Sequence, residues 1–312
     1  MNAEPTPIER AMVVYHDGRG GLRGGKVRRL SAVMAALGPI ATAVPGSAPD
    51  LDARLRSLNP ATDLLVCVGG DGTLNHFLRR LAACIGEERM WPRMAFAPAG
   101  TANDMARSLA VLTGREQNPE SLARAVAAGC GGKAGDLGRV VIDDGRTEYF
   151  HSFLGIGSPY DWVRIADSRW MAPVKRLGHA VCYPLCSLAV IAAKRSVEMT
   201  ITIGDEPQRS RLFALLVGNG RWLGGGLDLG RQVRLDSGRL EVLAIHDDTR
   251  RGLLRLLSAA KRGTGPRSIG AEEVTVELHG ACGLNLDGER VELGGTGRSI
   301  LLSVLAGKIR WV

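Results

Sequence analysis

Two glycine-rich loops hold the residues with the clearest chemical potential in this chain. The first spans residues 69–73, with the sequence Gly-Gly-Asp-Gly-Thr, and follows the apolar run 64–68 before a helical pattern begins. Glycines at a strand-to-helix turn let main-chain N–H groups point outward and leave room for a phosphate, and the helix adds its positive end. Asp71 would then hold a metal ion or position a hydroxyl beside that phosphate. The alternative is an ordinary strand-to-helix turn.

The second loop spans residues 98–104, with the sequence Pro-Ala-Gly-Thr-Ala-Asn-Asp, and follows the next apolar run. It offers Gly100, the hydroxyl of Thr101, the amide of Asn103 and the carboxylate of Asp104. Thr101 or Asn103 could instead serve only to cap the following helix. Two such loops on successive parallel strands converge on one edge of the sheet, where ligands bind in open α/β folds. The pair therefore predicts a site for a phosphorylated ligand.

The elements that must position these loops form an α/β pattern. Strands are expected at 11–15, 40–44, 63–68 and 94–97, and helices at 26–37, 51–58, 73–85, 102–109 and 121–128. This alternation predicts a Rossmann-like, mostly parallel sheet covered by helices on both faces. After the glycine-rich stretch 129–135 the pattern becomes strand-rich, with helical stretches at 161–194 and 249–261. We therefore predict a nucleotide-binding domain over 1–130 and a β-sandwich-like domain with helical insertions over 131–312.

Composition narrows the classes of function. The 312 residues are 45% hydrophobic and 23% charged, which suffices to bury the cores of two domains. A net charge of +8 favours anionic partners, but only 4% aromatic residues argue against base stacking, so nucleic acid is not expected as a partner. Six scattered cysteines without a CxxC pair predict reduced thiols. The N-terminus lacks the pattern of a secretion signal, which predicts a cytoplasmic protein.

In combination, GGDGT and PAGTAND resemble the catalytic domain of the diacylglycerol kinase family, which includes sphingosine and ceramide kinases and, more remotely, NAD kinase. Further segments follow in the family's order, namely 42–48, 136–138, 153–157, 218–226, 237–242 and 286–289. These later motifs are weak singly and informative only as an ordered series. The resemblance extends through most of the chain.

The resemblance implies ATP and Mg²⁺ as cofactors and a cleft between the domains that admits the lipid hydroxyl. Nucleotide contacts are implied for Thr42 and Thr101, and the candidate nucleotide-binding residues are Thr42, Gly69, Gly70, Asp71, Gly72, Thr73, Gly100, Thr101, Asn103 and Asp104. Glu289 matches the glutamate regarded as the general base in bacterial members. In the sphingosine kinase branch the aspartate that matches Asp71 takes that role, so both carboxylates remain candidates.

Two positions depart from the family pattern. The loop after the first strand, 16–20, has the sequence His-Asp-Gly-Arg-Gly where the family usually has Asn-Pro and Ser-Gly. Bacterial diacylglycerol kinases place an aspartate ligand of a structural Mg²⁺ where this chain has Ser237, so Asp236, one position earlier, is the candidate metal ligand together with Asp71. The second departure favours a lipid other than diacylglycerol.

The sequence thus predicts an ATP-dependent lipid kinase that phosphorylates a primary hydroxyl of diacylglycerol, ceramide or a sphingoid base. The alternatives are an NAD kinase-like enzyme and a catalytically inactive nucleotide-binding regulator. We expect peripheral association with the inner face of the membrane, and segment 161–194 could contribute Trp162 and Trp170 as interfacial anchors. That segment could equally be a core helix. Its apolar run, 181–193, is shorter than the roughly 20 residues of a membrane-spanning helix. The oligomeric state stays open, with a homodimer as one alternative.

Overall fold

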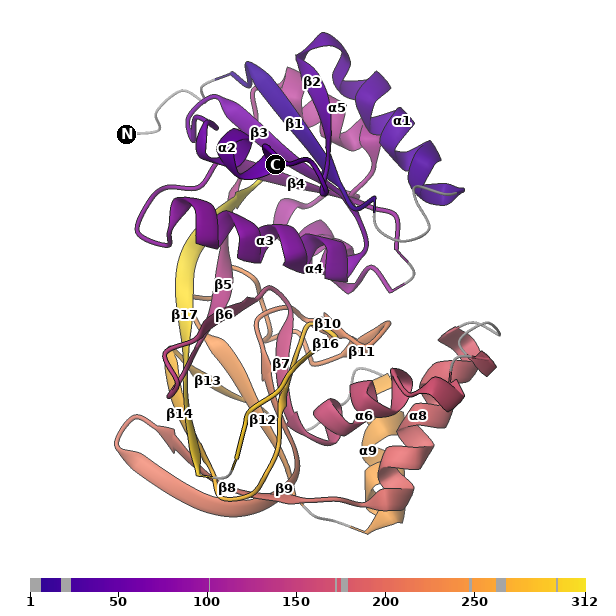
Figure 1. Ribbon diagram of the computed structural model, residues 1–312, viewed down its shortest axis with the longest axis vertical. Helices are drawn as coiled ribbons and strands as arrows, with labels where there is room; N and C mark the ends of the chain where they lie inside the picture. Colours follow the sequence, from indigo (N-terminus) through magenta and orange to yellow (C-terminus); the bar gives the residue numbers. More distant parts are fainter. Residues whose placement is uncertain are drawn as a thin grey trace. The chain divides into compact units, whose positions relative to one another are not determined.

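The chain divides into two compact units, which Figure 1 shows in the computed structural model. The structure describes residues 7–17, 24–100, 102–171, 173–174, 179–246, 249–261, 268–295 and 297–312. The first unit contains residues 1–137 and 306–312, and the second contains residues 138–305. The first unit ends seven residues after the domain boundary predicted at 130–131, and the end of the chain returns to this unit. Both crossings fall inside strands, β5 (Lys133–Ile142) and β17 (Arg298–Trp311), where no change in composition marks a boundary.

The first unit is built on a parallel sheet. Its strands are β1 (Arg10–Tyr15), β2 (Ala41–Pro45), β3 (Asp63–Gly69), β4 (Arg93–Pro98) and the end of β17, in the order β17-β4-β3-β1-β2. Tyr15 pairs with both Pro45 and Val68, and Val68 pairs with Ala97, so the carboxyl ends of β1 to β4 are level. This confirms the predicted parallel sheet and brings the loops after β3 and β4 to the same edge.

Helices cover both faces of this sheet (Figure 1). They are α1 (Gly25–Leu37), α2 (Leu51–Arg56), α3 (Asp71–Ile85), α4 (Asp104–Thr113) and α5 (Pro119–Ala127), with a 3-10 turn, η1 (Gly38–Ile40), after α1. Val33 of α1 and Leu122 of α5 pack on the face that includes Val66. Since side chains alternate along a strand, Leu65 and Cys67 point to the other face, and α3 packs against β3 there. All six cysteines are free thiols, and burial raises the pKa of Cys67.

The second unit is an antiparallel, sandwich-like β domain, as predicted. It contains β5, β6 (Thr147–Phe150), β7 (Phe153–Gly157), β8 (Val197–Ile203), β9 (Glu206–Gly218), β12 (Leu240–His246), β13 (Ile269–Ala271), β14 (Glu273–Leu278), β15 (Leu284–Leu286), β16 (Glu289–Val291) and β17, and a separate hairpin of β10 (Trp222–Leu223) and β11 (Leu227–Asp228). The pairing runs β16-β15-β7-β9-β8-β14-β17, and β12 also pairs with β9. One apolar core joins these strands, with Phe150, Leu215, Val276 and Ile300 among its members.

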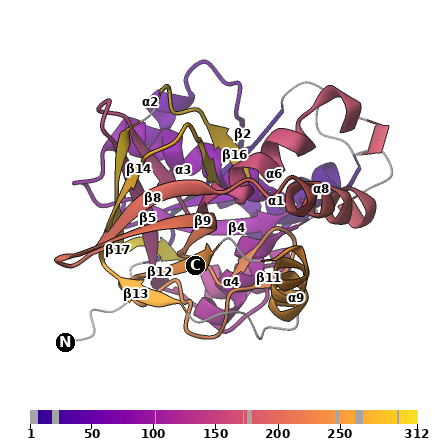
Figure 2. The same cartoon turned by 90° about the horizontal axis from the view of Figure 1, so that it is seen from below.

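Among the residues that the structure describes, three helices with defined bounds interrupt the strands of the second unit, at the two stretches where helices were predicted. They are α6 (Ser158–Ala166), α8 (His179–Ala193) and α9 (Arg250–Lys261), with a 3-10 turn, η2 (Arg169–Met171), between α6 and α8. The three helices lie side by side in Figures 1 and 2, and α8 contacts both α6 and α9. Within the described ranges, none of the helices combines the length and apolar character that crossing a membrane requires.

Candidate active site

The loop after β3 is shaped by positions without a side chain. A Cβ atom on Gly69 would lie 2.5 Å from Cβ of Thr73, closer than non-bonded carbon atoms approach. Helix α3 begins at Asp71, directly after Gly70, which has no side chain with which to cap it. The N–H groups of the first turn, including that of Gly72, are therefore not capped by the preceding residue. This end of α3 can donate to an anion, as the sequence predicted.

The loop after β4 lies directly against the first loop. The N–H of Ala99 donates to the carbonyl of Gly69 at 2.7 Å, which continues the pairing of β3 with β4 into the loops. A Cβ atom on Gly100 would lie 2.6 Å from Cα of Gly70. The prediction that the two loops meet at one edge of the sheet is thus confirmed, and their contact explains why glycine stands at position 100. Thr101 lies outside the described residues.

Asp71 ties the two loops together through its side chain. Its Oδ2 accepts the N–H of Asp104 and its Oδ1 accepts the N–H of Met105, both at 3.1 Å. These N–H groups belong to the first turn of α4, where donors have no partner within the helix. Asp71 therefore caps α4 across a sequence separation of 33 residues and complements the positive end of that helix.

Asn103 and Asp104 shape the second loop from within. Asn103 stands at the N-cap position of α4 with a φ of 51°, but its side chain makes no capping bond. Its amide instead accepts the N–H of Gly100 at 3.2 Å and donates to the Gly100 carbonyl at 3.0 Å. The buried carboxylate of Asp104 accepts a hydrogen bond from Arg107 at 2.6 Å. Asn103 and Asp104 thereby hold the loop that lies against Gly70.

The contact between the glycine loops leads to a stability prediction. Replacing Gly100 with alanine should lower the free energy of unfolding by about 2–3 kcal/mol, because the added methyl group would meet main-chain atoms that cannot turn aside. Urea denaturation measures the change. Gly280→Ala is the matched control, since a Cβ atom on Gly280 would lie 4.0 Å from Cγ1 of Val197, an ordinary van der Waals contact. Equal stability of G100A and wild type would mean that the two loops are free to separate.

Thr42 does not lie beside the glycine loops. It is exposed on β2, the outer strand of the sheet, and it pairs with Met12 of β1. Tyr15, which is paired with the last residue of β2, lies three positions further along β1. At about 3.3 Å per residue, Thr42 is therefore about 10 Å from the carboxyl edge along the strand. The nucleotide contact that the family resemblance implies for Thr42 stays a prediction.

Two further loops meet at the same edge. Asp17, after β1, accepts the N–H of Ser47, after β2, at 3.1 Å, and it also accepts the Ser47 hydroxyl. The hydroxyl bond is the main cause that lowers the pKa of Asp17 below its ordinary value. In α3, desolvation and then the charge of His16 lower the pKa of His76. Sequence analysis missed the Asp17–Ser47 pair, because nothing local marks partners 30 residues apart. Residues 18–20 of the first loop lie outside the described residues.

Glu289, the second candidate base, lies in the second unit at the start of β16. Its side chain is exposed to solvent. It follows a tight turn in which Asp287 and Gly288 both have positive φ, at 51° and 90°. Leu286 and Glu289 pair across this turn. Strands β15 and β16 therefore form a hairpin, and Glu289 lies at its end.

Asp287 anchors this hairpin. Its side chain is only 1% exposed, and its carboxylate accepts the main-chain N–H groups of His151, Ser152 and Phe153 at 2.8, 2.9 and 2.9 Å. Nε2 of His151 lies 3.6 Å from Oδ2 of Asp287. Three donors offset the cost of burying this carboxylate. The turn that carries Glu289 is thereby fixed to the segment between β6 and β7.

A buried asparagine joins a third segment to this network. Nδ2 of Asn219 donates to the carbonyl of His151 at 2.9 Å, and the N–H groups of Asn219 and Gly220 both donate to the carbonyl of Ser152 at 2.8 Å. The sequence motifs at 153–157, 218–226 and 286–289 are weak one by one. Their contact through Asp287 and Asn219 is visible only in the folded chain, because the sequence gives their order and not their proximity.

Substitution of Asp287 tests this network. Asp287→Asn should lower the free energy of unfolding by about 2 kcal/mol, because an amide NH₂ group would face a main-chain donor where the carboxylate now accepts. Asparagine tolerates positive φ, so the backbone of the turn can stay as it is. Urea denaturation provides the measurement, and Asp205→Asn, in the exposed turn between β8 and β9, is the control. Equal losses of unfolding free energy in the two variants would show that Asp287 does not anchor the hairpin.

Asp236, predicted as a metal ligand, is paired with Arg234. Nε and Nη2 of the guanidinium donate to its two carboxylate oxygens, each at 2.9 Å. In the part of the chain that the structure describes, no three His, Cys, Asp or Glu side chains are placed to hold a metal ion. The arrangement does not fit a metal cage at Asp236. The metal role predicted for Asp71 stays a prediction.

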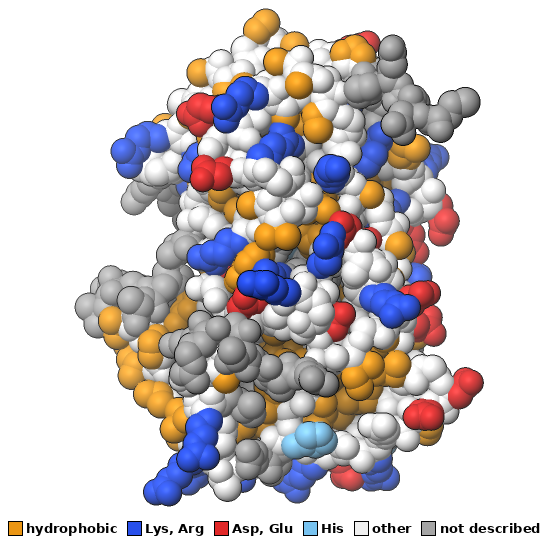
Figure 3. Space-filling model, turned by 180° about the vertical axis from the view of Figure 1, so that it is seen from behind, with side chains coloured by type: hydrophobic (Ala, Val, Ile, Leu, Met, Phe, Trp, Pro, Cys, Tyr) orange, Lys and Arg blue, Asp and Glu red, His pale blue; other side chains and the backbone are white. Residues whose placement is uncertain are grey.

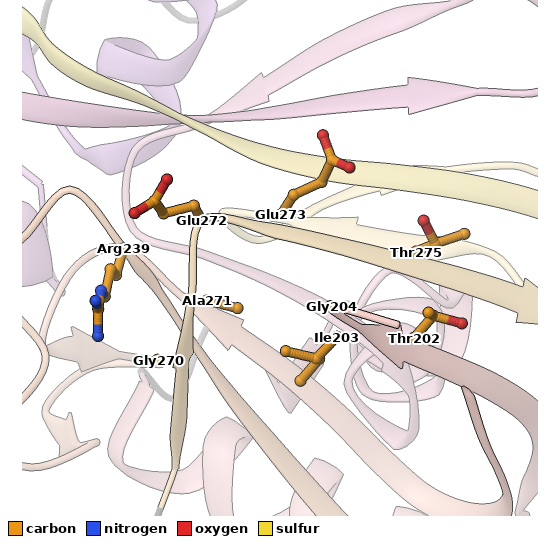
Figure 4. Close-up of a pocket in the computed structure, with 9 residues that line it drawn as sticks. All are labelled: Thr202, Ile203, Gly204, Arg239, Gly270, Ala271, Glu272, Glu273 and Thr275. Atoms are coloured by element: carbon orange, nitrogen blue, oxygen red, sulfur yellow. The ribbon is translucent and has the colours of Figure 1, made fainter. Parts of the chain in front are cut away.

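The second unit has a pocket of about 380 Å³, whose lining includes none of the predicted site residues (Figure 4). Its lining consists of Thr202, Ile203, Gly204, Arg239, Gly270, Ala271, Glu272, Glu273 and Thr275. The lining has two carboxylates and one guanidinium, a balance that disfavours a polyanionic nucleotide. The glycine loops with Asp71 in the first unit, and Glu289 in the second unit, therefore stay the candidate functional residues, rather than the lining of this pocket.

Comparisons with known proteins agree with both units. The model of the diacylglycerol kinase catalytic domain matches residues 10–139, and that of the YegS C-terminal NAD kinase beta sandwich-like domain matches residues 166–301. A probable lipid kinase YegS-like protein of Pseudomonas aeruginosa is 32% identical over 250 residues, which cover 79% of this chain and 75% of that protein. A diacylglycerol kinase of Bacillus subtilis is 25% identical over 236 residues, which cover 73% and 71%.

Solved structures share the fold. A putative diacylglycerol kinase from Bacillus anthracis superposes with a TM-score of 0.72 at 20% identity and covers 98% of both chains. Yeast NADH kinase in complex with NADH superposes with a TM-score of 0.55 at 10% identity, covering 98% of this chain and 82% of that one. At such identities the likeness concerns the fold alone, a parallel α/β unit followed by a β-sandwich-like unit.

Proposed function

Because the chain belongs to the family of the diacylglycerol kinase catalytic domain, we propose that it transfers the γ-phosphate of ATP to a hydroxyl of a membrane lipid. The leading acceptors are the primary hydroxyls of diacylglycerol and of ceramide or a sphingoid base. A membrane-lipid substrate implies that the protein acts at the inner face of the membrane. The observation that carries the proposal is the contact between the two glycine loops, tied by Asp71 at the carboxyl edge of the sheet.

The phosphates are proposed to bind at the N-terminus of α3. Asp71 already occupies the N–H groups of Asp104 and Met105 at the start of α4, whereas α3 follows Gly70, which cannot cap it. An anion at α3 gains both the main-chain donors and the positive end of a 15-residue helix. The close packing of glycines beside it lets a phosphate approach the backbone.

Glu289 is proposed as the general base, and Asp71 as the residue that positions the loops. A base takes up a proton, and protonation of Asp71 would weaken the charge-assisted bonds that hold α4. The turn that presents Glu289 is anchored by the neighbouring Asp287, whose carboxylate binds main-chain N–H groups. Its exposed side chain can accept a proton from a substrate hydroxyl.

The transfer itself exchanges one bond for another. The lipid hydroxyl oxygen forms a bond to the γ-phosphorus, and the bond between that phosphorus and the β–γ bridging oxygen breaks, so ADP leaves with the electron pair. Glu289 takes the hydroxyl proton. Mg²⁺, when bound with ATP, would neutralise phosphate charge, and Asp71 is the carboxylate that we propose would hold it.

A transfer assay tests the proposal directly. The purified protein is incubated with γ-³²P-labelled ATP and mixed micelles containing diacylglycerol, ceramide or a sphingoid base, and with NAD in a separate reaction. We expect label in the organic extract with at least one lipid. Label in NAD alone would instead identify an NAD kinase. Tight ATP binding without transfer to any acceptor would indicate an inactive regulator, and either result would overturn the proposal.

A further inference from the structure

Helix α8 exposes a continuous apolar face. Val181, Leu185 and Leu188 are 39%, 44% and 51% exposed, and Pro184 and Ala192 are also exposed. At about 100° per residue, these five positions fall within about one third of the helix circumference. No polar side chain interrupts them along that line. We call these five residues the α8 row.

The opposite side of α8 is already packed within the second unit. Cys182 and Cys186 belong to one apolar cluster and Val190 to another, and Trp162 packs against both clusters. A helix that is apolar on all sides is normally enclosed on all sides. Since α8 is enclosed on one side only, the α8 row is available to a partner outside the chain.

Trp162, which the sequence suggested as a membrane anchor, belongs to the packed side. Its ring meets Tyr183 edge-on, with the ring centroids 4.9 Å apart, and its Nε1 donates to the hydroxyl of Ser187 at 3.2 Å. The side chain of Trp170 lies outside the described part of the chain. The largest exposed apolar side chains that the structure describes in α8 belong to the α8 row.

Helix α9 lies beside α8 and adds positive charge (Figures 1 and 2). Arg250, Arg251 and Arg255 are exposed on α9, together with Leu254. Arg250 also donates to the carbonyl of Ala192 near the end of α8 at 2.9 Å, which joins the two helices. Figure 3 shows hydrophobic side chains gathered along the lower left of the molecule, over α8, with Lys or Arg side chains below them.

We infer that the α8 row and the arginines of α9 dock this protein on an anionic phospholipid bilayer. The row leaves water by entering the headgroup boundary, and the guanidinium groups meet lipid phosphates. A symmetric dimer through the same surface would instead bring the arginines of two copies together. The inference rests on the proposed function in one respect, since a lipid substrate gives the docking its purpose.

Vesicle sedimentation tests the inference without any assay of catalysis. Vesicles of phosphatidylcholine with 30 mol% phosphatidylglycerol are mixed with wild type, with Val181→Ser/Leu185→Ser/Leu188→Ser, and with Arg251→Gln/Arg255→Gln. We expect the apolar triple variant to bind about 100-fold more weakly. The arginine variant should bind about 20-fold more weakly to these vesicles and lose little on pure phosphatidylcholine.

A matched variant controls for the loss of exposed apolar surface as such. Val27→Ser/Val111→Ser/Ile269→Ser changes side chains that are 42%, 57% and 61% exposed elsewhere, and it should bind vesicles as wild type does. Failure of wild type to bind, or equal binding by the α8 triple variant, would overturn the inference. So would a wild-type dimer that the triple variant dissociates while vesicle binding persists. These readouts stay valid even if the protein phosphorylates no lipid, so the two proposals can fail separately.

Discussion

Replacing Glu289 with glutamine should lower kcat for lipid phosphorylation by about 1000-fold and leave the KM for ATP and the free energy of unfolding unchanged. Glutamine keeps the shape of the side chain but cannot take the hydroxyl proton. Glu289 is exposed, and the buried anchor of its turn is the neighbouring Asp287. Initial rates at saturating lipid over a range of ATP concentrations give kcat and the KM for ATP, and urea denaturation gives the free energy of unfolding.

The pH dependence separates a base from a residue that only orients the substrate. If Glu289 accepts the proton, the fall of kcat at acid pH in the wild type should disappear in E289Q. Glu206→Gln, at the exposed start of β9, is the matched control and should behave as wild type. A kcat for E289Q within tenfold of wild type would transfer the role of base away from this residue.

Replacing Asp71 with asparagine should have a different signature. We expect kcat/KM to fall by about 1000-fold with a raised KM for ATP, because an amide group can accept only one of the two main-chain N–H groups that Asp71 now binds. The bonds between Asp71, at the start of α3, and the loop that carries Gly100 would be weakened. The free energy of unfolding should fall by about 1 kcal/mol, the usual value of a charged helix cap.

Direct measurement of ATP binding by titration calorimetry completes this test. D71N should bind ATP more weakly than wild type, whereas E289Q should bind it equally well. Asp205→Asn serves as the control for loss of an exposed aspartate. If D71N bound ATP normally and lost only kcat, Asp71 would be the base and the assignment of the two carboxylates would have to be exchanged.

Much of the nucleotide site could be predicted from the sequence because its signals are local. The glycines at 69, 70 and 100 follow apolar strands directly, and a parallel sheet brings the ends of successive strands together whatever else the fold contains. The strands and helices of the first unit were predicted to within a few residues for the same reason. Hydrophobic periodicity over 5 to 15 residues reflects which face of an element is buried.

Contacts between distant residues could not be predicted in this way. The bonds of Asp71 to the start of α4 and of Asp287 to residues 151–153 join positions 33 to 136 apart. Both aspartates precede a glycine, and an Asp-Gly pair by itself predicts only a turn. The return of residues 306–312 to the first unit left no trace in composition, because β17 continues as one strand across the boundary.

The apolar run 181–193 shows most clearly how far prediction from the sequence alone can go. The sequence alone determined that this run forms a helix and is too short to span a bilayer, since both follow from residue type and length. Only the tertiary structure decided that Trp162 faces inward and that Leu185 and Leu188 face outward. Periodicity does not identify the buried side of a run with no charged residue, so the elements that pack against the helix decide which side is buried.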